Sequence, residues 1–138
     1  MKEDITDFER EVVAHGVKVG VQCGPGRKYD LQRLSEAATV TSMTWNEECS
    51  QFRLNLVVDT IGYVDQADFQ LLCYNNSLSY SISMCREAKS GGYSCHYHYM
   101  DAMTHGTPTL PIVGQLAGEC LAQLFYGPES SDHVVFQQ

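Results

Sequence analysis

The 138-residue chain, with 43% hydrophobic and 19% charged residues, has the composition of one globular domain and not of a disordered or fibrous protein. Its net charge of −8 repels phosphate backbones and anionic lipid surfaces, which disfavours direct nucleic-acid and membrane binding. The longest apolar-rich stretch, 110–126, contains interrupting polar residues and falls short of the ~20 apolar residues that span a bilayer. We therefore predict a single domain over residues 1–138.

The beginning of the sequence indicates where the protein is located. Charged residues, and not an apolar run, follow Met1, which predicts no secretory signal and a cytoplasmic location. In that compartment the six cysteines are expected to be reduced. No C-x-x-C pair is present, so the commonest zinc and redox motifs are missing.

In chain order, the first predicted element is a helix over 4–15, with Asp4 or Thr6 as its cap and Gly16 as its end. Its apolar stripe consists of Ile5, Phe8, Val12 and Val13. Alternating valines over 17–21 predict a short edge strand. A second helix is expected from a cap at Asp30 to the β-branched run at 39–41.

From residue 50 the hydrophobic period changes from about 3.6 to 2 residues. Four alternating segments, at 51–58, 68–73, 77–84 and 93–100, each predict a strand with one buried face. Asn75-Asn76 between the second and third segments indicates a hairpin turn. Short links between four consecutive strands predict an antiparallel meander.

A last helix is predicted over 110–126, with Pro111 in its first turn. Its wide apolar stripe should pack on the sheet, and Gly114 and Gly118 are interpreted as a close contact with the sheet. The predicted fold class is therefore α+β: two N-terminal helices, a four-stranded antiparallel meander and a C-terminal helix packed on the sheet.

The sharpest chemical motif is His96-Tyr97-His98, because two histidines two residues apart on a strand share a face and can reach one metal ion. His105 is the candidate third ligand, with Asp101 or Cys95 as alternatives. An H-x-H motif is weak by itself, and solvated surface histidines are the stronger interpretation. No cofactor is predicted.

The cysteines of the predicted strands and of the last helix are interpreted as small hydrophobic core residues. Cys73, Cys85, Cys95 and Cys120 are all assigned to inward-facing positions.

Composition favours an acidic protein-binding module of inhibitor, immunity, antagonist or chaperone type that acts by surface complementarity on a basic protein partner. The candidate contact residues from the densest acidic segment are Glu3, Asp7 and Glu11. Trp45 is a further candidate: its ring is either an exposed anchor for the partner or closes the edge of the core. A solvated acidic helix face is the alternative for that segment. The alternative function is a metal-dependent enzyme or small-ligand-binding protein that uses the histidine-bearing face of the sheet, and the sequence leaves open whether the protein is an enzyme.

Overall fold

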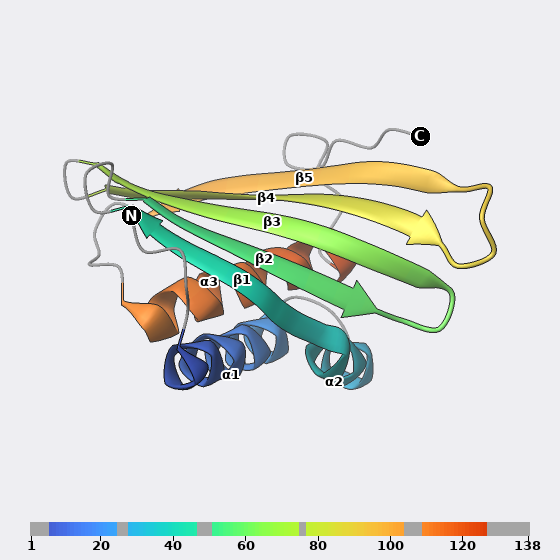
Figure 1. Cartoon of the computed structure of the whole chain (residues 1–138), viewed down its shortest axis with the longest axis horizontal. Coiled ribbons are helices and arrows are strands. Elements are labelled where there is room, and N and C mark those ends of the chain that lie inside the picture. The colour runs from blue at the N-terminus through green and yellow to red at the C-terminus, as the bar shows by residue number, and fades with distance from the viewer. Residues whose placement is uncertain (1–5, 25–27, 47–50, 75–76, 104–108, 127–138) are drawn as a thin grey trace.

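The computed structural model describes residues 6–24, 28–46, 51–74, 77–103 and 109–126. One sheet and three helices form two layers, with the helices together on one side of the sheet (Figure 1). The elements are α1 (Asp7–Cys23), α2 (Lys28–Ala37), β1 (Ala38–Asn46), β2 (Gln51–Asp59), β3 (Tyr63–Tyr74), β4 (Ser77–Ala88), β5 (Ser94–Met103) and α3 (Leu110–Tyr126). The predicted α+β class is confirmed, with five antiparallel strands and not four. None of the described helices is long and apolar enough to cross a membrane.

Helix α1 is longer than predicted and replaces the expected strand at 17–21. Thr6 caps it by accepting a hydrogen bond at 3.1 Å from the Glu9 backbone N–H, while the Glu9 carboxylate accepts one from the Thr6 N–H. The helix continues through Gly16 because Val13, Val17 and Val21 recur every four residues on its buried side. Val17 and Val21 therefore belong to a buried helical stripe and not to a strand, and Val19 lies outside that stripe.

Glycines bring α1 and α3 into close contact. A Cβ atom at Gly16 would lie 2.8 Å from the Pro111 carbonyl oxygen, and Cβ atoms at Gly20 and Gly118 would overlap the facing backbone. Gly114 and Gly118 therefore pack on α1, which corrects their interpretation as a contact with the sheet. Helix α3 still packs on the sheet as predicted, and the strands it contacts are β4 and β5.

The first strand, β1, was not predicted from the sequence, which placed the β-branched run at 39–41 at the end of a helix and assigned no element to the residues up to Asn46. It pairs antiparallel with β2, with Trp45 opposite Phe52, and the register shifts between Val40 and Ser42. Near this irregularity the Arg10 guanidinium donates a hydrogen bond of 2.6 Å to the Val40 carbonyl oxygen, which ties α1 to the edge of the sheet. Strand β1 thus completes a simple meander in the order β1-β2-β3-β4-β5.

The core lies between the helices and one face of the sheet. Strand β2 alternates strictly, with Phe52, Leu54, Leu56 and Val58 buried against the helices. Strands β3 and β4 pair as far as Tyr74 and Ser77, so the predicted hairpin is present, although Asn75 and Asn76 lie outside the described residues. The opposite face of the sheet is not covered by any described element (Figure 1).

Candidate functional site

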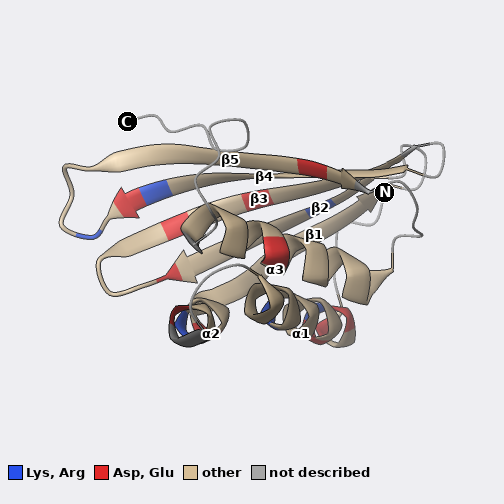
Figure 2. Cartoon of the chain, turned by 180° about the vertical axis from the view of Figure 1, so that it is seen from behind, with Lys and Arg blue, Asp and Glu red and all other residues tan. Residues whose placement is uncertain are grey.

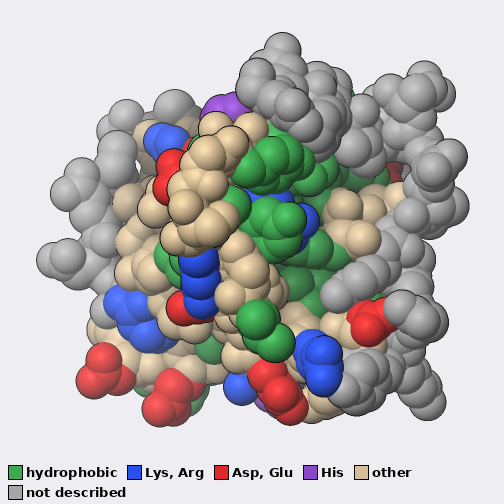
Figure 3. Space-filling model, turned by 90° about the vertical axis from the view of Figure 1, so that its right-hand side faces the viewer, with side chains coloured by type: hydrophobic (Ala, Val, Ile, Leu, Met, Phe, Trp, Pro, Cys, Tyr) green, Lys and Arg blue, Asp and Glu red, His purple; other side chains and the backbone are tan. Residues whose placement is uncertain are grey.

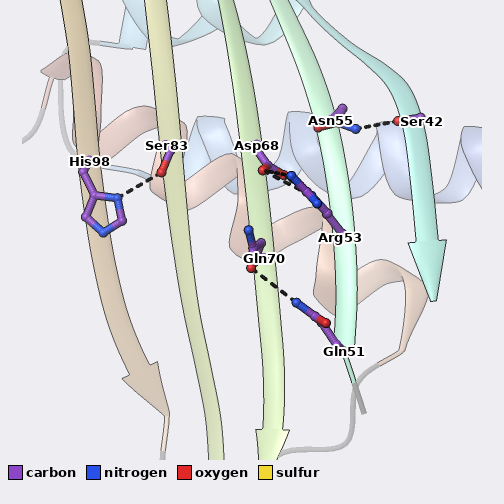
Figure 4. Close-up of polar contacts among 8 residues, drawn as sticks. All are labelled: Ser42, Gln51, Arg53, Asn55, Asp68, Gln70, Ser83 and His98. Carbon is purple, nitrogen blue, oxygen red and sulfur yellow. Dashed lines mark hydrogen bonds and ion pairs between the residues drawn. The ribbon is translucent and has the colours of Figure 1, made fainter. Parts of the chain in front are cut away.

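The uncovered face of the sheet is polar, and its side chains form hydrogen bonds between neighbouring strands. Asn55 donates to Ser42 at 2.7 Å, and Gln51 donates to Gln70 at 3.3 Å (Figure 4). We call this surface the open face. Its polarity agrees with the predicted alternation, since each strand turns one set of side chains to the core and the other to solvent.

Opposite charges also meet on the open face. The Arg53 guanidinium donates one hydrogen bond from Nε, shared between both oxygens of the Asp68 carboxylate, and one from Nη2 at 2.6 Å (Figure 4). The hydrogen bond and charge of Asp68 raise the pKa of Arg53. Because the two charges neutralise each other, the middle of the open face has little net charge.

The two predicted metal ligands on β5 share the open face, but each ring contacts its neighbour on β4 and not the other histidine. His98 Nδ1 lies 3.1 Å from Ser83 Oγ, and His96 Nε2 lies 3.9 Å from Cys85 Sγ (Figure 4 shows the former pair). His105 lies outside the described residues. Within the described part of the chain, no three His, Cys, Asp or Glu side chains have the arrangement of a metal site.

Cys85 was assigned to the core, and the structure corrects this. It is half-buried on the open face, opposite His96, because it shares the parity of Ser83 while Met84 points to the helices. Burial raises the pKa of the Cys85 thiol, and the nearby charge of Glu87 raises it further. The assignment to the core agrees with the burial of Cys95 and Cys120, and Cys73 is half-buried.

Acidic residues are spread over helices and strands and do not gather on one face (Figure 2). The first turns of α1 still hold the densest group, and there Asp7 and Glu11 are both exposed. Glu3 lies outside the described residues. The structure thus places two of the three predicted acidic contacts near each other on one helix.

Phe8, between these acids, is the main departure from the predicted stripe of the first helix. Its side chain is 72% exposed, whereas Val13 is fully buried. Phe8 lies on a shallow groove of about 350 Å³ along α1 and the start of α3. We call this the α1–α3 groove; it is lined by apolar Phe8, Val12, Val19 and Pro111 and by polar Glu11, His15 and Gln115.

Trp45, the fourth predicted contact residue, lies half-buried on β1. Its ring stacks on Phe52 with centroids 3.9 Å apart and packs against the core. This position closes one edge of the core, and Trp45 is not among the described residues that line the α1–α3 groove with Glu11.

The core contains an ion pair that was not predicted from the sequence. Asp65 is fully buried and accepts hydrogen bonds from Arg86 Nε at 2.9 Å and Nη2 at 3.1 Å. The guanidinium lies over the rings of Tyr63 at 4.6 Å and Phe125 at 4.9 Å. Burial by itself lowers the pKa of Arg86, but the hydrogen bonds and charge of Asp65 outweigh it and raise the pKa.

The sequence could have indicated this pair, because alternate residues of a strand share one face. Asp65 therefore lies on the same inward face as Ala67 and Phe69. Beside it, a pocket of about 690 Å³ opens between α2, the β2–β3 turn and Phe125. Figure 3 faces this end of the molecule, where hydrophobic side chains gather and charged side chains lie among and below them. Lys89 and Asp59 form an ion pair of 2.6 Å at the rim.

The chain matches no protein-family model, no curated protein and no solved structure. Its function is therefore inferred from its own residues.

Proposed function

We propose that this protein is an acidic protein-binding module whose α1–α3 groove receives an apolar side chain from a basic partner. The observation that carries the proposal is the 72% exposure of Phe8 on an apolar groove that also contains Glu11. Burying a phenylalanine side chain contributes about 1.5 to 3 kcal/mol, which gives Phe8 the properties of a binding hot spot.

Charge near the groove supports a basic partner. Glu11 lies one helical turn after Phe8 and lines the groove with it, and Asp7 is exposed in the first turn of the same helix. Lys or Arg residues that flank an apolar anchor in the partner would face these acids. Such complementarity accelerates association and disfavours wrong partners.

The groove also has a rigid base. Gly16 lines it and packs against the backbone of α3, so the two helices below the groove are held at short distance. A preformed groove binds without the entropic cost of ordering its walls.

A second candidate is a metal-dependent enzyme or small-ligand-binding protein that uses the histidine-bearing open face. The proximity of Cys85 and His96 favours it.

Photocrosslinking tests the proposed interface. A benzoylphenylalanine probe at Gln115, in the groove, should capture a partner that a probe at Ser81, on the open face, does not. With the purified partner, Phe8→Ser should weaken binding tenfold or more, as expected for a hot-spot residue. Ile61→Ser is the matched control, because Ile61 is 93% exposed but lies away from the groove, and it should leave affinity nearly unchanged.

Two results would contradict the proposal. A partner captured through Ser81 and not through Gln115 would bind the sheet instead of the helices. A partner whose affinity is unchanged by Phe8→Ser would not use the groove.

A further inference from the structure

Strand β5 forms one edge of the sheet, and no described element pairs with its outer side (Figure 1). The direction of its backbone groups follows from one contact, in which the Ala88 N–H donates a hydrogen bond of 3.0 Å to the Tyr93 carbonyl oxygen. The register of β4 and β5 continues unbroken from this pair, and hydrogen-bonded pairs alternate along an antiparallel ladder. The even-numbered residues of β5 therefore direct their N–H and C=O groups away from β4.

The outward backbone groups end at Asp101. Its carboxylate accepts a hydrogen bond of 2.8 Å from the Ala102 N–H, so that outward donor already has a partner. Before it, the outward groups meet no donor or acceptor within the described part of the chain. We call these residues the β5 edge: Ser94, His96, His98 and Met100.

The other edge of the sheet, β1, is protected by features that β5 lacks. Its register shifts between Val40 and Ser42, and the Arg10 guanidinium donates to the Val40 carbonyl oxygen. Irregularities and covering groups of this kind prevent an edge strand from pairing with another chain, as do Lys and Pro residues in the strand. Strand β5 has a continuous register and contains no Lys, Arg or Pro. Its edge is therefore suited to pairing with a further strand.

The charge of the β5 edge indicates which strand that is. Residues 94–100 contain no Asp, Glu, Lys or Arg, although the chain has a net charge of −8. Such a segment has no carboxylate to attract a basic partner, but it lets two acidic copies approach with the least repulsion. Two identical strands can also pair antiparallel about a two-fold axis, the commonest symmetry of homo-oligomers. The occupant that fits the β5 edge is a second copy of this chain.

We propose that the β5 edges of two copies pair antiparallel and join the two sheets into one. The β5 edge is centred on Tyr97, so Tyr97 lies opposite Tyr97 of the second copy. His96 then lies opposite His98 of the second copy, and this pair exchanges both of its N–H···O=C hydrogen bonds. Because β1 is protected, association stops at the dimer. The contact uses none of the residues that line the α1–α3 groove.

Sedimentation equilibrium and amide hydrogen exchange of the reduced full chain test the dimer. The measured mass should rise with concentration from 15.4 kDa toward twice that value. The amides of Tyr97 and Tyr99 bond to β4 and should exchange slowly at every concentration. Those of His96 and His98 should exchange slowly only as the dimer forms, since they are exposed to water in the monomer.

Substitutions at position 98 separate backbone pairing from side-chain contacts. His98→Pro removes one outward N–H and should give a folded monomer, because proline is tolerated where the N–H of an edge strand faces solvent. His98→Thr keeps that N–H and should dimerise as the unmodified protein does. Circular dichroism of both variants shows whether they fold.

A second pair of variants leaves the backbone unchanged. His96→Lys with His98→Lys brings cations together across the two-fold axis and should weaken the dimer tenfold or more, because like charges repel at an interface. Leu72→Lys with Ser79→Lys is the matched control, since it adds the same charge at exposed positions of β3 and β4 on the open face. This control should leave dimerisation nearly unchanged.

Each of three results would overturn the proposal. A chain that stays monomeric at every concentration does not pair through β5. Slow exchange of the His96 and His98 amides in that monomer would mean that another segment of the same chain covers the β5 edge. A dimer that survives both His98→Pro and the lysine pair at positions 96 and 98, or that Phe8→Ser dissociates, would associate through a different surface.

Discussion

Gly20 of α1 lies directly against the backbone of Gln115 in α3, so that a Cβ atom at position 20 would overlap the Gln115 carbonyl group. The side chain of Gln115 lines the α1–α3 groove. The same contact therefore sets both the distance between the two helices and the shape of the proposed binding groove.

Gly20→Ala should lower the free energy of unfolding by about 2 kcal/mol or more, because overpacking against backbone forces the helices apart. This loss should exceed the gain of about 1 kcal/mol from replacing a helical glycine by alanine. Gly62→Ala is the control, because no atom lies within 4 Å of its Cβ position, and it should change stability by less than about 0.5 kcal/mol. Chemical denaturation measures both variants, and equal stabilities would contradict the close helix contact.

The ion pair in the core should show strong coupling. Asp65→Ala leaves the Arg86 guanidinium without its buried carboxylate and should cost about 3 to 5 kcal/mol. Replacing both residues, as Asp65→Leu with Arg86→Met, should recover most of this loss, because no unpaired charge stays in the core. A double-mutant cycle from denaturation curves measures the coupling, and strictly additive effects would show that the two side chains do not stabilise the fold as a pair.

Three tyrosines make stability depend on alkaline pH. Burial raises the pKa of Tyr80 and Tyr97, and burial together with the nearby Asp101 carboxylate raises the pKa of Tyr99 to about 12. Since the folded protein holds these protons more tightly than the unfolded chain, their contribution is complete below the unfolded value near 10 and is lost as pH rises toward 12.

The free energy of unfolding should therefore fall over that alkaline range, and less steeply in Tyr99→Phe. Denaturation curves at a series of pH values measure the slope. An identical slope in the unmodified protein and in Tyr99→Phe would contradict the raised pKa of Tyr99.

The sequence was sufficient for elements whose hydrophobic period is unambiguous. Strand β2 and helix α3 were predicted because their apolar residues follow one period throughout. The valines at 17, 19 and 21 fit a period of 2 locally, and only the contact of Gly16 and Gly20 with α3 shows why the helix continues. Strand β1 was missed because its short β-branched run could equally end a helix.

Whether the candidate sites could be predicted from the sequence depended on which side of a helix or strand is covered by other elements. Phe8 belongs to an apolar stripe of α1, but α3 and the sheet cover only the neighbouring stripe of Val13, Val17 and Val21, and a single sequence does not show which stripe is covered. Cys85 and Asp65 could have been assigned from strand parity alone, since both follow the alternation of their strands. The partner of each depends on the register between strands.

The most direct measurement of the proposed function is the association rate of the captured partner at low and high salt. Asp7→Lys with Glu11→Lys should slow association tenfold or more at low salt and much less at high salt, where exposed charges are screened. Glu36→Lys with Glu87→Lys makes the same change in net charge away from the groove and should slow association far less. Equal rates for the two pairs of substitutions, or rates that neither pair nor salt changes, would contradict an acidic interface at the α1–α3 groove.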